Sequence, residues 1–257
     1  MKRNSLVYIF LLMCLTPIMA QTIEYADEES STEARLRVGA DFQYNPVKGL
    51  SLSLEEEARM RNNFCTFDRL YSTFDISYRV NSYFKFGGAY SFMILYQDGR
   101  KKTDYVSYWD FRHRAVAHAT GSISFNRFTL SLRERFQTTF RTDSLYNENE
   151  VVNPKMYLRT RLKLEYDFFS KPLKPYLSVE MFNPLNQTKY TNQWIDEMQY
   201  RLGLEWRLDA FNTLEFFYMF DHSFGNDVDV KSKKDKVIIT PETEYNHIIG
   251  VFYSIRF

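Results

Sequence analysis

Large apolar side chains recur at every second position along most of this chain, and this period constrains the fold more than any other feature. In residues 35–44 one phase is apolar or aromatic, while the other carries Arg35, Arg37, Asp41 and Gln43. Successive side chains of an extended strand point to opposite faces, so a period of two predicts strands with one apolar and one polar face. After residue 20 no apolar run approaches the length of about 18 residues that a membrane-spanning helix needs.

The same alternation returns in ten further stretches. They are residues 50–54, 69–80, 84–96, 111–125, 128–141, 158–168, 177–181, 200–208, 214–221 and 245–257. Aromatic residues make up 18% of the chain, and they suit the pleated surface of a sheet. The sequence therefore predicts an all-β fold with eleven clear strands.

Two architectures share this pattern. A soluble sandwich or barrel buries the apolar face, whereas a transmembrane barrel turns it to lipid and keeps the polar face in the lumen. The strands are about ten to fourteen residues long, which suits a tilted crossing of the bilayer. Aromatic residues stand at the ends of the apolar faces, as interfacial girdles require. They are Tyr44, Tyr96, Phe125, Phe140 and Phe168.

The connections alternate in length, and this favours the membrane barrel. Short links fall at residues 81–82, 126–127, 170–174 and 209–212, and long polar ones at residues 97–104, 142–155, 183–197 and 225–244. Outer-membrane barrels have short periplasmic turns and longer outer loops. The last long connection contains KSKKDK, residues 231–236, which is typical of a solvated loop tip, with a polybasic binding site as the alternative.

We therefore expect one closed antiparallel transmembrane β-barrel of about 12 strands (10–12) over residues 21–257. Bacterial single-chain barrels normally have an even number of strands, which conflicts with the eleven counted from Arg35 onward. Residues 21–32 could supply a twelfth strand, although the acidic segment DEESS, residues 27–31, is a poor strand former.

Residues 1–20 have the layout of a cleaved secretory signal peptide. Lys2 and Arg3 precede an apolar stretch, and cleavage fits best after Ala20. A membrane-anchor helix is the alternative, although the stretch is short for one. Removal of these residues leaves 31 basic and 32 acidic side chains, a balance that does not indicate nucleic-acid binding. It also leaves Cys65 as the only cysteine, so no internal disulfide can form.

Several stretches resemble a known family. They are LSLSLEEEARM (50–60), DRLYSTFDISYRVNSYFKFGGAYSF (68–92), FRHRAVAHATGSISFNRFTLSLRERFQ (111–137), YLRTRLKLEYDF (157–168), KPYLSVEMFNPLN (174–186) and YRLGLEWRLD (200–209). Their strand pattern, tight turns and inward arginines are similar to the DUF2490 family of outer-membrane β-barrel proteins typical of the Bacteroidota. The resemblance implies a porin-like barrel in the outer membrane of a Gram-negative bacterium, and it supplies no catalytic residues.

Of the four histidines, only His118 falls on the polar, inward phase of its strand, together with Thr120 and Ser122. His113 and His247 fall on the lipid phase, and His222 lies near the loop rim. A histidine with nearby hydroxyl groups is compatible with a lipid-modifying hydrolase, although a catalytic triad is recognised by geometry and not by spacing. An ordinary hydrogen-bonded lumen histidine is the alternative interpretation.

Charged residues on the inward phases form the main candidate site. This lumen-facing cluster is predicted to contain Arg112, Arg114, Arg133, Arg135, Arg159, Arg161, Glu165, Arg201 and Glu205. One interpretation is a charged pore constriction or an anion site. The other is a lumen filled by salt bridges, which the small diameter of a 10–12-stranded barrel favours.

The sequence thus predicts a non-enzymatic narrow pore or a structural or adaptor protein of the envelope, without a cofactor or a metal. The alternatives are an outer-membrane lipid-modifying hydrolase that uses His118 and a soluble ligand-binding β-barrel. Outer-membrane lipid and, during biogenesis, the barrel-assembly machinery are the expected partners. A small solute or an envelope protein could be a further one.

The closing strand predicts an assembly requirement. Residues 245–257 end in an aromatic residue and resemble the C-terminal signal of outer-membrane proteins, with Tyr253 and Phe257 as its aromatic positions. Deletion of Phe257 should therefore lower the amount of heat-modifiable protein in the outer-membrane fraction, as seen on gels of boiled and unboiled samples. An unchanged yield would contradict this assignment.

Overall fold

The structure is a computed structural model that describes residues 22–101, 104–142, 153–169, 171–187, 193–231 and 236–257. All of its regular elements are strands. They are β1 (Thr22–Tyr25), β2 (Glu29–Val47), β3 (Leu50–Arg61), β4 (Thr66–Arg79), β5 (Phe84–Lys101), β6 (Asp104–Phe125), β7 (Phe128–Arg141), β8 (Lys155–Tyr166), β9 (Leu173–Pro184), β10 (Glu197–Arg207), β11 (Asn212–Lys231) and β12 (Lys236–Arg256). Within these ranges no helix has the length and hydropathy needed to cross a membrane.

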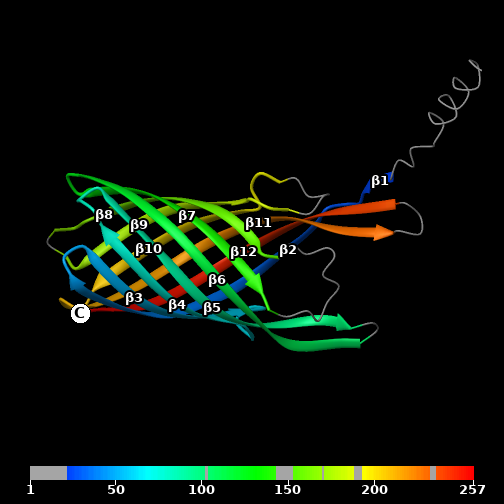
Figure 1. Ribbon diagram of the computed structural model, residues 1–257, viewed down its shortest axis with the longest axis horizontal. Helices are drawn as coiled ribbons and strands as arrows, with labels where there is room; N and C mark the ends of the chain where they lie inside the picture. Colours follow the sequence, from blue (N-terminus) through cyan, green and yellow to red (C-terminus); the bar gives the residue numbers. More distant parts are fainter. Residues whose placement is uncertain (1–21, 102–103, 143–152, 170, 188–192, 232–235) are drawn as a thin grey trace, which may run out of the picture.

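Strands β2 to β12 follow one another around a closed barrel, and β12 returns to pair with β2 (Figure 1). The count of eleven is confirmed, but the expected antiparallel closure is wrong. Consecutive strands alternate in direction, so the first and last of an odd number run the same way. Fifteen residue pairs, from Glu29 with Glu242 to Gln43 with Arg256, therefore form a parallel seam.

Strand β1 is not a twelfth strand of the barrel wall. It pairs in parallel with Lys236–Ile239 of β12, beyond the stretch that β2 covers, so it extends the line of β2. The structure also corrects the expectation for DEESS, because Glu29 to Ser31 open β2 and pair with β12. An odd count places the start of β2 and the end of β12 at opposite rims, as Figure 1 shows.

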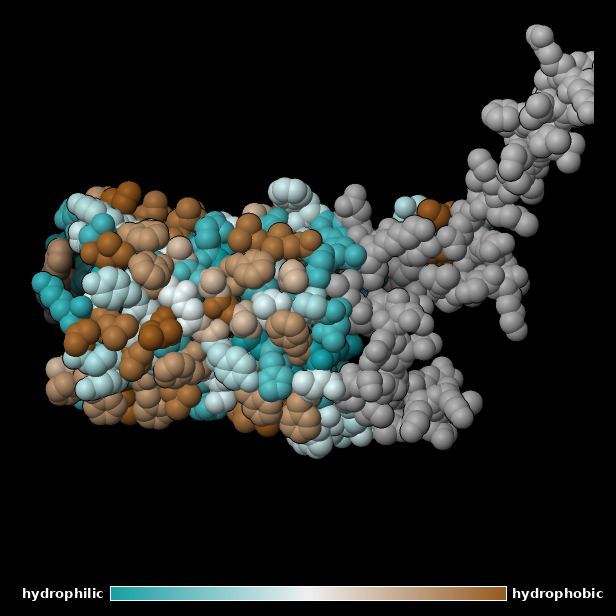
Figure 2. Space-filling view, in the orientation of Figure 1, coloured by the Kyte–Doolittle hydropathy of each residue, from teal (hydrophilic) through white to brown (hydrophobic). Residues whose placement is uncertain are grey.

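The barrel wall is apolar outside and polar inside. On β7, Leu132 and Phe136 face outward and are 48% and 42% exposed, whereas Gln137 faces the lumen at 4%. Figure 2 shows hydrophobic side chains over much of the wall and hydrophilic ones gathered toward its ends. This distribution inverts that of a soluble protein and is the arrangement of a transmembrane β-barrel.

Several polar side chains on the outer face are paired with neighbours on the next strand. Thr160 donates to Glu134 at 2.9 Å, and Ser72 donates to Glu56 at 2.5 Å. The outward His113 is bonded to the hydroxyl of Tyr90 at 2.5 Å. Each bond offsets part of the cost of placing a polar group on an apolar surface.

The tight turns lie at one rim, and they are stabilised by short polar side chains. The carboxylate of Asp209 accepts a hydrogen bond from the side-chain amide of Asn212 at 2.7 Å and from the backbone N–H groups of Phe211 and Asn212, both at 2.8 Å. These bonds, the side-chain one first, lower the pKa of Asp209. Asn81 accepts two backbone bonds of the same kind. Asn126 reaches the φ of 54° that its two-residue link requires, a value that asparagine tolerates better than most residues.

The opposite rim carries the longer connections, but two of them are not loops. Residues 97–104 and 225–244, both predicted as loops, mostly continue the strands of the β5–β6 and β11–β12 hairpins, which project beyond the barrel (Figure 1). Residues 143–152, 188–192 and 232–235 lie outside the described residues, and so do most of KSKKDK and the predicted signal peptide.

Aromatic side chains form a chain of ring contacts at the short-turn rim. Phe125 contacts Phe128, which contacts Tyr166, which contacts Phe168, with centroid separations of 5.7, 5.0 and 4.7 Å. Phe257 also lies at this rim. Its backbone N–H donates to Gln43 at 2.8 Å and its carbonyl accepts from Asn45 at 3.3 Å, so the last residue extends the seam.

The parallel seam can be tested by cross-linking. Val38 and Val251 are register partners, and the spacing of about 4.8 Å between adjacent strands suits a disulfide. In a Cys65→Ser background, Val38→Cys with Val251→Cys should form an intramolecular disulfide under mild oxidation, seen as a faster-migrating band on a non-reducing gel.

The matched control is Val38→Cys with Tyr253→Cys, two residues further along the same face. The extra separation of about 6.6 Å along the strand should largely prevent that bond. Equal cross-linking of both pairs would argue against the register, and none in either would argue against the seam.

Candidate functional site

Two clusters of buried apolar side chains lie in the half of the lumen nearest the long connections, among buried polar groups that include Asp110, Asp221 and Asn246. One cluster consists of Tyr71, Met93 and Leu95, and a second consists of Phe217, Met219 and Ile248 with Phe252 against it. Met219 and Ile248 are 0% exposed, and Met93 and Leu95 are 2% exposed. Alternation does not predict these two clusters, here together called the plug, because it assigns polar residues to the lumen.

Glycines on the lumen side let aromatic rings lie flat against the wall. A Cβ at position 250 would overlap the ring of Phe217, and one at position 39 would overlap the ring of Phe252. Glycine at these two positions therefore provides the space that the second cluster of the plug needs.

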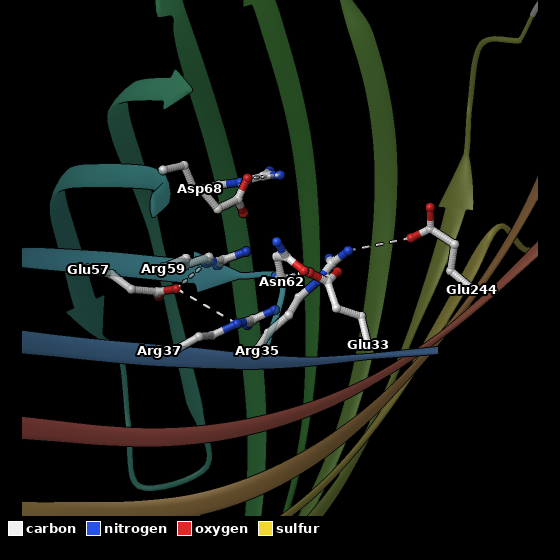
Figure 3. Close-up of polar contacts among 9 residues, drawn as sticks. Glu33, Arg35, Arg37, Glu57, Arg59, Asn62, Asp68 and Glu244 are labelled. Carbon is white, nitrogen blue, oxygen red and sulfur yellow. Dashed lines mark hydrogen bonds and ion pairs between the residues drawn. The ribbon is translucent and has the colours of Figure 1, made fainter. Parts of the chain in front are cut away.

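An ion network adjoins the plug on β2, β3 and β4 (Figure 3). Arg35 bridges Glu33 at 2.7 Å and Glu244 at 3.7 Å. Glu57 pairs with Arg59 and lies 4.0 Å from Arg37. The close-up shows these side chains reaching from neighbouring strands toward one another, which adds a charged layer to the closed end.

Arg112 belongs to this closed end. Its guanidinium lies 2.5 Å from the carboxylate of Asp110, which is 2% exposed and lies 4.0 Å from Arg141. Sequence reasoning grouped Arg112 with the other inward arginines because their strand phases agree. The structure separates it from them by its height in the barrel.

The other half of the lumen holds a chamber of about 480 Å³. A second cavity of about 410 Å³ shares Asp41 and Glu215 with it, and its lining includes residues 171–174 beside a short turn. The two cavities therefore follow one another from the middle of the lumen to the short-turn rim. At its other end the chamber is lined by Tyr71, Phe217 and Phe252 of the plug.

Four arginines, here called the arginine quartet, line one wall of the chamber. Arg133 stands directly opposite Arg161, and Arg135 directly opposite Arg159, on the adjacent strands β7 and β8. Glu180 on β9 accepts hydrogen bonds from Arg133 at 3.1 Å and from Nε of Arg159 at 3.2 Å, and a terminal guanidinium nitrogen of Arg159 forms an ion pair with it at 3.1 Å.

The quartet is short of negative charge. Within the part of the chain that the structure describes, Arg135 and Arg161 make no ion pair, and the buried Nε atoms of Arg133, Arg135 and Arg161 have no hydrogen-bond partner. The whole chamber lining contains ten cationic and six acidic side chains, a formal excess of four positive charges.

The opposite wall, formed by β2, β3 and β4, carries Asp41, Glu55 and Asp75. Asp41 faces Glu55 directly across the β2–β3 pair. The chamber is therefore bipolar, with a basic wall at β7–β8 and an acidic one at β2–β4. Opposed walls of this kind create a field across the lumen that orients a charged solute.

The remaining predicted site residues lie near the quartet or closer to the short-turn rim. Arg114 donates to Thr139 at 3.1 Å, and Arg201 lies 4.0 Å from Glu215, both at the chamber wall. Glu165 and Glu205 each accept from the Lys163 ammonium at 2.9 Å. Of these two acids, Glu205 lines the second cavity.

Sequence reasoning did not assign four cationic residues of the chamber to the site. They are Arg37, Arg59, Lys85 and Lys163. The signal was present in the strand phases, since Arg37 shares the polar phase of β2 with Asp41. The strand phase predicts which face a residue occupies, but it does not predict the position of that residue along the barrel axis.

His118 is buried at the chamber wall, and its Nε2 lies 2.7 Å from a carboxylate oxygen of Asp75. Among the described residues no hydroxyl group makes a hydrogen bond to His118. A Ser-type triad needs a nucleophile on the nitrogen opposite the orienting acid. The arrangement is that of an ion-paired or hydrogen-bonded lumen histidine.

Comparisons with known proteins place the chain in a family. The model of the family described as "Protein of unknown function (DUF2490)" matches residues 34–231. No curated protein matches the chain. Among solved structures, the NanC porin is 9% identical, with a TM-score of 0.45 over 72% of this chain and 86% of that one. Outer-membrane expressed OmpT of Vibrio cholerae is 9% identical, with a TM-score of 0.39 over 70% and 56%. Because the family model covers most of the chain, this protein belongs to the DUF2490 family.

Proposed function

We propose that this protein is a non-enzymatic β-barrel of the Gram-negative outer membrane whose lumen is a closed-ended chamber and not an open pore. The observation that carries the proposal is the plug, in which Met219, Ile248, Met93 and Leu95 are at most 2% exposed. We infer that these side chains, together with the buried polar groups beside them, leave no continuous water path through the lumen. Of the two functions expected from the sequence, this geometry favours a structural or binding protein of the envelope over a conducting pore.

The outer-membrane location rests on the distribution of side chains and on the two unlike rims. The outer wall is apolar, an aromatic girdle lies at the short-turn rim, and the hairpins β5–β6 and β11–β12 extend from the other. In this placement the short turns face the periplasm and the hairpins face outward. Outer-membrane lipid surrounds the wall, and assembly uses the barrel-assembly machinery.

A hydrolase centred on His118 has less support. The Nε2 atom of His118 is bonded to Asp75, and no described hydroxyl group is bonded to the ring. The chamber around His118 is lined mainly by charged side chains, which a lipid acyl chain would have to desolvate. We therefore propose that His118 positions Asp75 at the acidic wall.

The closed lumen predicts electrical silence. The folded wild-type protein in a planar bilayer should give no single-channel steps, because the plug blocks ions. Met219→Ala with Ile248→Ala should open brief steps, and removal of these buried side chains should lower the free energy of unfolding by about 2–5 kcal/mol for each residue.

The matched control is Leu202→Ala with Leu177→Ala, two residues that face outward and are 56% exposed. That variant should stay silent, which would show that the steps do not come from general loosening. Stable steps from wild-type protein of proven heat-modifiability would refute the closed lumen.

The orientation predicts which cysteines can be labelled from outside. Cys65 is exposed in the link between β3 and β4 at the rim of the long connections. A polyethylene-glycol maleimide too large for general porins should label Cys65 in intact cells. Arg127→Cys in a Cys65→Ser background, at the opposite rim, should react only after the outer membrane is permeabilised, and the reverse pattern would overturn the orientation.

A further inference from the structure

We propose that the arginine quartet is a binding site for a small solute with two or more oxyanion groups, which enters the chamber from the short-turn rim. The inference adds a ligand class to the closed chamber proposed above and rests on that chamber. Its chemistry is shared by phosphate and carboxylate compounds, and the experiment below separates these two sources.

The arrangement of the quartet is electrostatically unfavourable without a ligand. Like charges placed directly opposite each other on adjacent strands destabilise a sheet, and here two such pairs are adjacent: Arg133 with Arg161 and Arg135 with Arg159. Glu180 offsets one of the four positive charges. Salt bridges that only filled the lumen would place acids and bases opposite one another. The remaining positive charge is accounted for by an anion that binds there.

The quartet also offers N–H donors to a ligand. The buried Nε–H groups of Arg133, Arg135 and Arg161 have no partner within the described residues. Guanidinium groups bind phosphate and carboxylate through paired N–H donors in a planar fork. Register partners lie about 5 Å apart and residues two apart along a strand about 6.6 Å, so the quartet can hold more than one oxyanion group.

The chamber has the volume and the position that a small solute needs. A chamber of about 480 Å³ falls within the range of about 300–1,000 Å³ that is usual for small-molecule sites. The second cavity shares Asp41 and Glu215 with the chamber and lies beside a short turn, whereas Tyr71, Phe217 and Phe252 of the plug line the chamber on the opposite side. Glu55 and Asp75 on the far wall can accept hydrogen bonds from hydroxyl groups of the same solute.

Calorimetric titration of the full-length protein, folded in detergent at constant ionic strength, tests the site. The probes are pyrophosphate, citrate and glucose. Saturable binding is expected for pyrophosphate or citrate and none for neutral glucose. Binding of pyrophosphate alone would assign phosphate compounds, and binding of citrate alone would assign carboxylates. Absence of binding for both anions would overturn the proposal.

Two variants locate the site. Arg135→Gln with Arg161→Gln removes the two quartet members that lack ion pairs, and it should weaken anion binding at least tenfold. Because these residues repel their neighbours, the heat-modifiability and unfolding midpoint of the ligand-free protein should not fall. Arg79→Gln with Lys48→Gln, which removes the same number of positive charges at exposed positions that do not line the chamber, should bind like the wild type. Equal weakening by both variants would indicate a general charge effect and refute the site.

Chemical modification of the second cavity tests the route by which the solute enters. Thr213 lines the second cavity, so Thr213→Cys in a Cys65→Ser background places a thiol on the proposed path. A bulky maleimide attached there should block anion binding, whereas the same reagent on wild-type Cys65 should leave it intact. The opposite result would overturn entry from the short-turn rim.

These outcomes can be told apart from a failure of the closed lumen. A protein that conducts ions and still loses anion binding in the double variant would refute the closed lumen alone. A protein that gives no single-channel steps and binds neither anion would refute the anion site and leave the closed lumen standing.

Discussion

The whole structure depends on the parallel seam between β2 and β12. In a hydrocarbon environment every backbone N–H and C=O group must have a partner, so a sheet can cross the membrane only if it has no open edge. Fifteen register pairs close the barrel, and the backbone of Phe257 extends the seam at the short-turn rim. Because the number of barrel strands is odd, the closing pair β2–β12 must be parallel. The start of β2 and the end of β12 therefore lie at opposite rims.

The closed wall allows its two faces to serve different purposes. Lipid-facing positions need only be apolar, and the few polar ones, such as Glu134 and Glu56, take a hydroxyl partner from the next strand. The lumen is divided along its axis. One half is packed around Met219 and Ile248, and the other is a charged chamber with a basic and an acidic wall. The quartet of Arg133, Arg135, Arg159 and Arg161 gives the chamber its excess of positive charge.

Sequence reasoning succeeded where the physics is local. Alternation fixes which face a side chain occupies, so the eleven strands and the inward phases of Arg133 and Arg161 follow from the sequence. The predicted length of the connections was less reliable, since residues 97–104 and 225–244 are polar and still form hairpins. Polarity favours a loop only where no neighbouring strand offers backbone partners. Alternation also does not predict the plug. Ile248 and Phe252 are apolar residues on the lumen phase of β12, where the pattern assigns polar side chains.

The amino-acid sequence by itself determined the fold class, the two faces of the wall and the family, because each depends on periodicity within single strands. The tertiary structure decided how those strands are combined. It closed the eleven-stranded barrel through one parallel strand pair, β2 with β12. It also placed Arg112 in the plugged half with Asp110 and set four arginines beside a single glutamate. Those features depend on register and on height along the barrel axis. Both are fixed by pairing between strands that can be distant in the chain, which no pattern within one strand records.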